Sequence, residues 1–504
     1  MKVFNHLEQL IAYGIQKGMI DFEDSDCVRN ELWKVIGAEA DLDSVEKCTS
    51  FDGEIYALLD ELVTDAREHG RTLEFLYEVE SFQAELMSKL MPRPSELNRQ
   101  FYEHYENSPN EATDFFYELS MDSTYIRTDR TSKNISWETE TDYGKMDITI
   151  NLSKPEKDPR EIALQKNVKA VKYPKCLLCK ENVGYKGRVD HPARQNHRII
   201  NLTLGGERWY FQYSPYVYYN EHAIVLCETH RNMKIDRMTF VRLCDFVDVF
   251  PHYFVGSNAD LHTVGGSILS HDHYQAGNYE MPMMRAKSLM TYEPKAYEDV
   301  KIDILDWPVS VLRVTSKDRK SLIDISDAIL NNWIEYSDEE VDLVAYTDER
   351  HNTITPILRK NGEAYELFLA LRNNRKSEES PEGIFHVQRK HHHIKRENIG
   401  LIEVMGLAVL PSRLVAEMDL VKSCIDETGL NLSKCEQFES LEKHLVWLSE
   451  IKPMIDASMQ SETALDEVIK AEIGAKFSSA LCDAGIYKNK WERMTVFLKE
   501  GAKL

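Results

Sequence analysis

A glycine-rich turn that runs into alternating polar residues is the strongest chemical signal in the chain. The segment reads Gly265-Gly-Ser-Ile-Leu-Ser-His271-Asp-His273-Tyr-Gln275. If it continues as a strand over 266–274, the two histidines and the glutamine share one face, about 7 Å apart at alternate positions. The amides of Gly265, Gly266 and Ser267 could face phosphate oxygens, as the amides of an anion-binding nest do. The pattern predicts an imidazole aimed at a phosphate; the alternative is a solvated polar strand edge.

A second group of residues could hold a metal ion. Cys176-Leu-Leu-Cys179 is a CxxC motif, whose two thiolates can reach one tetrahedral ion. The chain has no second CxxC, so the remaining ligands would be histidines, and the candidates are His191, His197, His230 and His271. The alternative is a pair of ordinary core cysteines.

Length, charge and composition limit the classes of protein to consider. The 504 residues correspond to about three domain-sized units, and the composition is that of a folded globular chain. The net charge of −23 argues against non-specific nucleic-acid binding or an anionic membrane surface. No segment reaches the ~18 apolar residues of a membrane span, and the first residues lack a signal-peptide pattern. We therefore expect a cytoplasmic protein with no nucleic-acid or membrane partner.

The hydrophobic pattern predicts helices at both ends and strands between them. We expect a helical N-terminal region over 1–120, two mixed regions over 121–295 and 296–415, and a helical C-terminal region over 416–504. The strands expected in the mixed regions cover 146–151, 208–213, 222–227, 253–257, 266–274, 309–314, 352–358, 365–371 and 401–409. A histidine-rich stretch at 386–393 precedes the last of these strands, which hints at an internal duplication.

The segment Asn258 to Gln275 resembles the signature of the histidine-triad superfamily, in the transferase branch that has glutamine in place of the third histidine. The HxHxQ form, the CxxC motif and the segment Tyr218 to His230 occur in the same order in the galactose-1-phosphate uridylyltransferase family. The acidic helical N-terminus and the segment His191 to Arg198 resemble its second bacterial type. The resemblance implies an α+β fold of two related histidine-triad-like halves with antiparallel sheets, flanked by the helical regions.

The same resemblance implies roles for individual residues. His273 would attack the α-phosphorus of UDP-glucose, and the covalent uridylyl-histidine would then pass UMP to galactose 1-phosphate. Gln275 would hydrogen-bond the phosphoryl oxygens in any protonation state. A structural zinc ion would be held by Cys176, Cys179, His230 and His271. A homodimer is also expected from the family.

Substrate contacts and a second metal are less specific expectations. The candidate substrate-binding residues are Asn258, Gly265, Gly266, Ser267, Arg194 and Arg198. His391 and His393 could hold a second metal, belong to a basic patch for the sugar phosphate, or lie in a solvated charged run. Asp272 and Ile268 depart from the first type of the family, and we give Asp272 no catalytic role. The alternative functions are a histidine-triad nucleotide hydrolase or phosphorylase, and a zinc-bound interaction scaffold without enzymatic activity.

Overall fold

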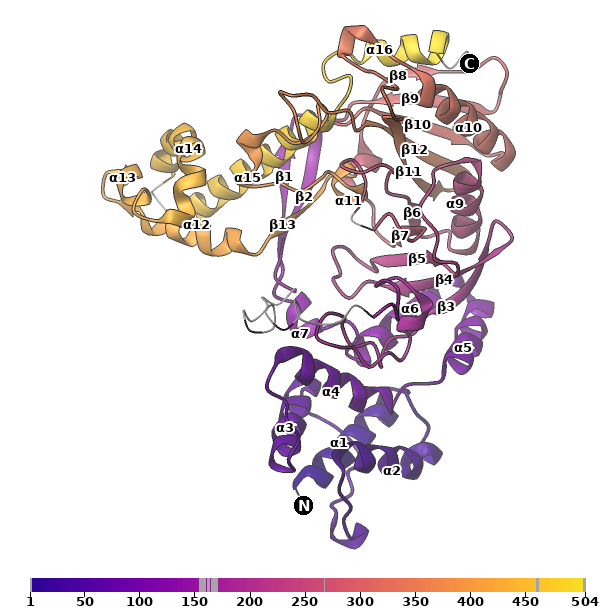
Figure 1. Cartoon of the computed structure of the whole chain (residues 1–504), viewed down its shortest axis with the longest axis vertical. Coiled ribbons are helices and arrows are strands. Elements are labelled where there is room, and N and C mark those ends of the chain that lie inside the picture. The colour runs from indigo at the N-terminus through magenta and orange to yellow at the C-terminus, as the bar shows by residue number, and fades with distance from the viewer. Residues whose placement is uncertain are drawn as a thin grey trace.

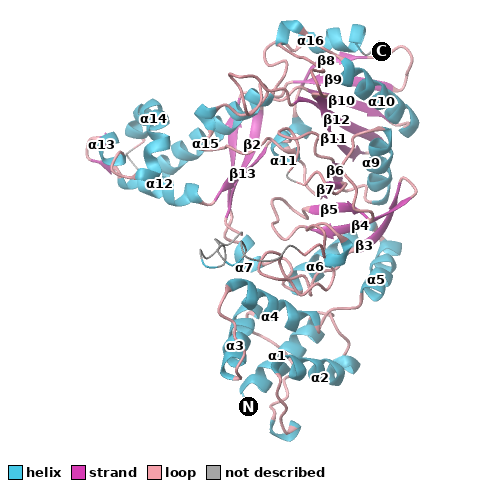
Figure 2. Ribbon diagram, in the orientation of Figure 1, coloured by secondary structure: helices cyan, strands magenta, loops and turns pink. Residues whose placement is uncertain are grey.

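The centre of the molecule is a ten-stranded antiparallel sheet, with a three-stranded sheet beside it and helices at both ends (Figures 1 and 2). This computed structural model describes residues 2–153, 160, 164, 171–266, 268–458 and 462–501. No helix in these ranges is long and apolar enough to cross a membrane.

The N-terminal region is helical, as the sequence predicts. Its helices are α1 (Lys2–Gln16), α2 (Ser25–Ile36), α3 (Ile55–Glu68), α4 (Leu76–Ser88), α5 (Pro94–Asn107), α6 (Pro109–Asp122) and the short α7 (Thr128–Thr131). Apolar residues recur every three or four positions, so each long helix has one face to bury. In α1, for example, Leu7 and Leu10 are fully buried. This apolar core continues into one face of the large sheet.

The large sheet contains the same five-strand unit twice. The first unit consists of β3 (Ile200–Leu204), β4 (Glu207–Tyr213), β5 (Ala223–Cys227), β6 (Phe254–Gly256) and β7 (His273–Gly277), with α9 (Arg237–Val249) between β5 and β6. The second consists of β8 (Ser288–Tyr292), β9 (Val300–Leu305), β10 (Val311–Ser316), β11 (Asn352–Asn361) and β12 (Ala364–Asn373), with α10 (Arg319–Glu335) between β10 and β11. The order across the sheet is β3-β4-β5-β7-β6-β11-β12-β10-β9-β8, so the units have identical topology and meet where β6 pairs with β11. The predicted α+β fold of two related antiparallel halves is confirmed, whereas the boundaries at 120, 295 and 415 stay predictions.

The rest of the chain encloses the other face of this sheet. β1 (Ile135–Thr141), β2 (Gly144–Asn151) and β13 (Leu407–Pro411) form the small sheet, in which β13 runs parallel to β2. Beyond it lie α12 (Arg413–Ser423), α13 (Leu432–Cys435), the β14 (Ile425–Asp426) and β15 (Gly429–Leu430) hairpin, α14 (Leu445–Ala457) and α15 (Glu462–Ala484). The last helix, α16 (Glu492–Val496), instead contributes Met494 to the first apolar core. In Figure 1, α12, α13 and α14 form an arm that projects to the left. A second apolar core joins this region to β2, β13 and the second half.

Two predicted strands are shorter than their patterns suggest. The strand expected over 266–274 begins only at His273, and the described residues ahead of it, Gly266 and 268–272, are not part of a strand. The strand expected over 401–409 is first the helix α11 (Leu401–Val404) and becomes β13 only at Leu407. The backbone of Gly406 separates the two elements with a φ of 95°, a conformation that favours glycine.

Candidate active site

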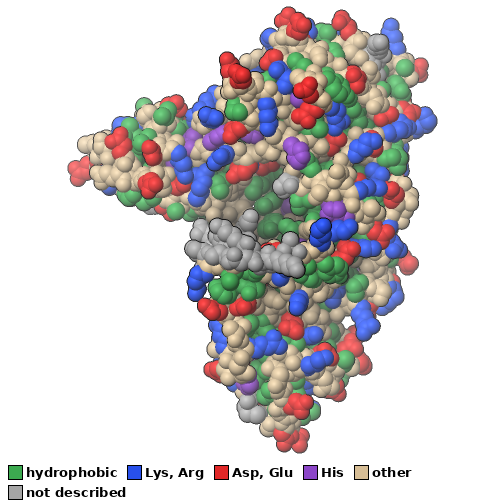
Figure 3. Space-filling view, viewed as in Figure 1, with side chains coloured by type: hydrophobic (Ala, Val, Ile, Leu, Met, Phe, Trp, Pro, Cys, Tyr) green, Lys and Arg blue, Asp and Glu red, His purple; other side chains and the backbone are tan. Residues whose placement is uncertain are grey.

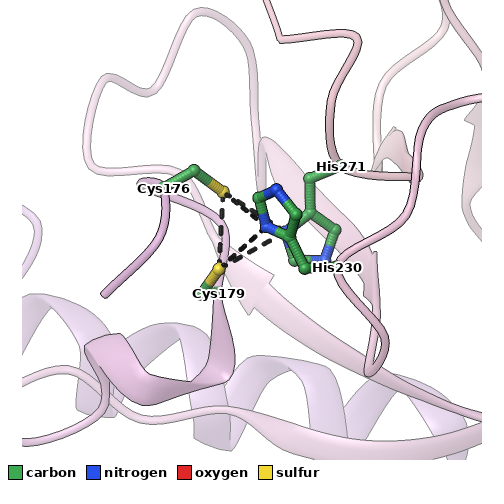
Figure 4. Close-up of side chains that lie close together, drawn as sticks. All are labelled: Cys176, Cys179, His230 and His271. Atoms are coloured by element: carbon green, nitrogen blue, oxygen red, sulfur yellow. Dashed lines mark hydrogen bonds between the residues drawn. The ribbon is translucent and has the colours of Figure 1, made fainter. Parts of the chain in front are cut away.

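Four predicted metal ligands from distant parts of the chain lie together (Figure 4). The Nδ1 atom of His271 is 3.3 Å from the Cys176 sulfur and 3.7 Å from the Cys179 sulfur. The Nδ1 atom of His230 is 3.7 and 3.2 Å from the same two sulfurs, which are themselves 3.6 Å apart. Around a tetrahedral zinc ion, sulfur and nitrogen ligands are separated by about 3.6 Å. The four donors therefore have both the chemistry and the spacing of a Cys₂His₂ zinc site.

The rival metal ligands have other partners. His191 hydrogen-bonds Asn182 through Nε2, at 2.6 Å from Oδ1. His197 Nε2 lies 3.0 Å from Gln212 Oε1. Neither histidine belongs to a group of three or more potential metal ligands among the described residues.

The metal cluster is connected to the predicted nucleophile through one backbone carbonyl. Nδ1 of His271 faces the two cysteines, and its other ring nitrogen, Nε2, lies 2.8 Å from the Cys227 carbonyl at the end of β5. The carbonyl of His271 in turn lies 2.8 Å from Nδ1 of His273, the first residue of β7. An ion held by His271 would therefore fix the group that orients His273. This also corrects the sequence-based geometry, because His271 lies in the loop and not on the strand face.

His273 is prepared to act through a single nitrogen. Nδ1–H donates to the His271 carbonyl, so the lone pair of the neutral ring lies on Nε2. Burial lowers the pKa of His273 to about 4, and the ring is therefore neutral at pH 7. The side chain lines a large cavity. This combination gives an unprotonated imidazole nitrogen access to a bound ligand.

The cavity has a volume of about 1020 Å³ and is lined by both halves of the molecule. The space-filling view shows this face hollowed near its centre, between the arm and the large sheet (Figure 3). Of the predicted site residues, the structure brings His273, Gln275, Asn258, Gly265, Gly266 and Arg194 to the cavity. Ser267 lies outside the described residues. Asp272 pairs with Arg231 instead, at 3.3 Å.

Asn258 connects the two halves at the cavity wall. Its Oδ1 accepts a hydrogen bond of 2.9 Å from the amide of Leu401, the first residue of α11. A Cβ on Gly266 would lie only 2.7 Å from Asn258 Nδ2, so the close approach requires glycine at that position. Asn258 therefore lines the cavity and also joins the two halves through this hydrogen bond.

The two predicted arginines have different environments. Arg194 lines the cavity, and its guanidinium lies over the ring of Tyr125, 5.4 Å from the centroid. Arg198 is not among the lining residues; it donates to the carbonyls of Pro92, Gln195 and His197. Burial lowers the pKa of Arg198 to about 10. The side chain of Arg198 therefore ties the first half to the N-terminal region.

The histidines predicted to hold a second metal do not assemble a ligand set. His393 Nδ1 lies 2.9 Å from His444 Nδ1, and His391 Nε2 lies 3.5 Å from a carboxylate oxygen of Asp483. Neither is part of a group of three potential ligands within the described ranges. In this part of the chain, three potential metal ligands do lie together, but they are Glu382, His386 and His392.

Three further polar residues of the cavity are ones that the motifs do not single out. Gln212 comes from β4, His222 from the residue before β5, and Lys395 from the loop ahead of α11. Lys395 is 3% exposed, and its Nζ lies 2.7 Å from Glu403. The register of the sheet explains the position of Gln212: it is opposite Ile224 on β5, which is opposite Gln275 on β7, so its side chain lies on the same face of the sheet as that of Gln275. Nothing in the local sequence separates Lys395 from its charged neighbours.

Comparison with known proteins decides the family. The N-terminal domain model of galactose-1-phosphate uridyl transferase matches residues 59–232, and the C-terminal domain model matches residues 246–426. The galactose-1-phosphate uridylyltransferase of Fusobacterium nucleatum is 48% identical, over 99% of this chain and 98% of that protein. The chain belongs to the galactose-1-phosphate uridylyltransferase family.

Other members of the family are equally complete matches. The enzyme of the same name from Clostridium perfringens is 47% identical over 97% of both chains, and that from Bacillus subtilis is 44% identical over 99% of this chain and 97% of its own. Among solved structures, yeast Ap4A phosphorylase Apa2 matches with a TM-score of 0.33 and 12% identity, over 64% of this chain and 90% of that one. Family membership confirms that the chain is a uridylyltransferase and excludes the non-enzymatic scaffold. The expected homodimer stays a prediction.

Proposed function

We propose that this enzyme transfers UMP from UDP-glucose to galactose 1-phosphate through a covalent uridylyl-His273 intermediate. The observation that carries the proposal is the hydrogen bond from His273 Nδ1 to the His271 carbonyl, which leaves the Nε2 lone pair free at the cavity. The names of the matched relatives supply the sugar phosphate acceptor.

The two half-reactions balance without an additional proton donor. His273 Nε2 attacks the α-phosphorus, forming the N–P bond, while the bond to the bridging oxygen breaks and glucose 1-phosphate leaves with the electron pair. In the second step, a phosphate oxygen of galactose 1-phosphate attacks the same phosphorus. The P–N bond breaks, its electron pair returns to Nε2, and UDP-galactose is released.

Gln275 supplies a neutral donor next to the nucleophile. It is two residues from His273 on β7, so both side chains face the cavity. Its Oε1 is occupied by His222, 3.2 Å away, and its amide N–H groups are left for the phosphoryl oxygens. A donor that does not titrate stabilises the charge developing on those oxygens over a wide pH range.

The second half contributes the groups that we assign to the hexose phosphate. Lys395 lines the cavity together with Glu397, Asn398 and Glu403. Burial opposes the charge of Lys395, but the two carboxylates raise its pKa, so the ammonium group is retained. Among the described residues, Lys395 and Arg194 are the cations that the two halves bring to the cavity of this acidic protein. They would offset the charge of the two phosphates of UDP-glucose.

We also propose that Cys176, Cys179, His230 and His271 hold a zinc ion. With four protein ligands the site is closed, so the ion supplies a rigid anchor rather than a reactive water. The residues of this chain then hold the His271 carbonyl in place for Nδ1 of His273.

Intact-protein mass after incubation with UDP-glucose alone tests the proposal. The wild type should gain the mass of one UMP group and lose it when galactose 1-phosphate is added. His273→Gly should show no adduct, whereas the neighbouring variant Asp272→Asn should still form one. Accumulation of free UMP without an adduct would instead indicate a nucleotide hydrolase.

A further inference from the structure

Two histidine–glutamine pairs, each with a buried histidine, lie at the cavity wall. His222 Nε2 is 3.2 Å from Gln275 Oε1, and His197 Nε2 is 3.0 Å from Gln212 Oε1. The two histidines are 3% and 2% exposed, and within the described residues Nδ1 of neither has a hydrogen-bond partner. Both glutamines line the cavity. Because the arrangement occurs twice, we expect each glutamine amide to contact a different part of one ligand.

Each histidine fixes the direction of its glutamine amide. Burial lowers the pKa of His197 to about 3 and that of His222 to about 4, so both rings are neutral at pH 7. A neutral ring carries one proton. On Nδ1 that proton would form a buried N–H without an acceptor, whereas on Nε2 it can be donated to the glutamine oxygen, so the surroundings favour Nε2–H. If the amide turned over, its NH₂ group would face the N–H and the hydrogen bond would be lost. Both glutamines therefore present only donors to the cavity.

The strand register places the two amides at different parts of a bound nucleotide. Gln212 on β4 is opposite Ile224 on β5, which is opposite Gln275 on β7. Two strand spacings, about 10 Å, separate the backbones of the two glutamines. Gln275 lies two residues from the nucleophile, so the register keeps Gln275 near the phosphorus and leaves Gln212 two strands away, available to the nucleoside part of the ligand.

Aromatic residues line the cavity beside both histidine–glutamine pairs. The His197 ring stacks on Tyr125, with centroids 4.5 Å apart. Tyr216 and Tyr218 also line this cavity with their rings stacked on one another, and Tyr218 stacks in turn on His222, with centroids 5.3 Å apart. Flat apolar surfaces with a few fixed polar groups are typical of sites for a nucleobase.

We propose that Gln212 reads the uracil base by donating to its O4 carbonyl, and that His197 is the positioning residue that makes the amide a donor. This inference rests on the proposed function, because it places UMP with its phosphorus at His273. Uracil has an acceptor at position 4, where cytosine has an amino group that donates. A glutamine held with its NH₂ toward the base accepts uracil and opposes cytosine.

The ratio of kcat/KM for UDP-glucose to that for CDP-glucose tests the proposal. Gln212→Glu replaces the donor with an acceptor, so the ratio should shift about 10- to 100-fold toward CDP-glucose. Gln275→Glu is the matched control: it alters the phosphoryl contact, so both activities should fall together and the ratio should stay constant. A Gln212→Glu ratio within about twofold of the wild type would overturn the assignment.

Two substitutions of His197 distinguish positioning from a structural role. His197→Phe keeps a ring against Tyr125 but cannot hold the amide, so selectivity for uracil should fall. His197→Gln can still donate an N–H to the Gln212 oxygen, but its own amide can also turn over, so selectivity should fall less than in His197→Phe. Equal selectivity in both variants would refute the role of His197.

A second measurement covers variants with low turnover. Calorimetric affinities for UMP and CMP should show the same shift in preference for Gln212→Glu, and an unchanged preference would again overturn the proposal. The proposed function fails separately, if the wild type forms no uridylyl adduct with UDP-glucose.

Discussion

Replacing His197 with phenylalanine should make the stability of the protein less sensitive to acid. His197 has an ordinary pKa of 6.5 when solvated, and burial lowers it to about 3 in the folded protein. Between these values the unfolded chain binds a proton that the folded chain does not bind. Stability decreases as the pH falls wherever the unfolded state holds more protons, so acid destabilises the wild type through this residue.

The size of the effect follows from the two pKa values. A pH of 5 is 1.5 units below the pKa of 6.5 that the histidine has in the unfolded chain. At about 1.36 kcal/mol per pH unit, protonation of the unfolded chain therefore costs the folded state about 2 kcal/mol of stability. At pH 7 the same term is about 0.2 kcal/mol. The free energy of unfolding of the wild type, relative to His197→Phe, should therefore fall by about 2 kcal/mol between pH 7 and pH 5.

Urea unfolding followed by tryptophan fluorescence at both pH values measures this difference. Tyr125→Phe is the control, because it changes the ring stacked on His197 without a group that titrates in this range. Its effect on stability should be the same at pH 7 and pH 5. A constant difference between wild type and His197→Phe at the two pH values would show that the ring is not kept neutral by burial. A neutral His197 ring would then not be what holds the Gln212 amide in one orientation.

Three further changes test the metal cluster, the connection between the halves and the hexose subsite. Cys179→Ser should lower bound zinc, measured by mass spectrometry, from one ion per chain to about one tenth or less, and lower the melting temperature by about 5–10 °C. Wild-type zinc content in this variant would contradict the site. Asn258→Ala leaves the buried amide of Leu401 unpaired and should cost about 1–3 kcal/mol in urea unfolding. Asn258→Asp keeps the acceptor and should cost less; equal losses would exclude this hydrogen bond as the cause. Lys395→Met should raise KM for galactose 1-phosphate about 10- to 100-fold, while hydrolysis of the uridylyl enzyme by water stays constant. An unchanged KM would remove Lys395 from the hexose subsite.

Local patterns predict β2, β4, β5, β6, β10, β11 and β12, but they miss β1, β3, β8, β9 and the short β14 and β15. β4, β5 and β6 lie within one or two residues of the predicted ranges, because short apolar or alternating runs are a local property. The 266–274 segment has the alternation of a strand, yet its described residues ahead of His273 do not belong to one. The His271 ring is held between the two cysteines and the Cys227 carbonyl. These contacts are made across 44 or more residues, so no local pattern could reveal them.

The prediction over 401–409 fails for a different reason. Its apolar residues fit a strand, but Glu403 accepts a hydrogen bond from the amide of Gly400, and Asn258 accepts one from that of Leu401. Both contacts satisfy the free amides at the start of a helix. The Gly400–Glu403 contact could have been noticed in the sequence, whereas the one from Asn258 joins residues 143 positions apart.

The candidate site shows the same division between local and distant information. The CxxC motif and the HxHxQ segment are enough to identify seven cavity or cluster residues by type and spacing: Cys176, Cys179, His271, His273, Gln275, Gly265 and Gly266. The spacing could not show that His197 serves Gln212 and not a metal, because that contact depends on the path of the chain from the loop into β4. Residue types predict the chemistry, and the register of the sheet determines the partners.

The two halves differ at the position of the proposed nucleophile. β7 and β12 occupy equivalent places in the two units, but where β7 has His273 and Gln275, β12 has a buried run that includes Phe368, Leu369 and Ala370. The histidines at 386–393 follow β12, so they are not the counterpart of the nucleophile strand. The second half instead supplies Lys395 and its neighbours as the opposite wall of the cavity. The unit β3–β7 thus holds the proposed nucleophile, and residues that follow the second unit supply the proposed substrate-binding groups from another part of the cavity wall. A single unit could not provide this arrangement, because Lys395 and its neighbours lie outside both units.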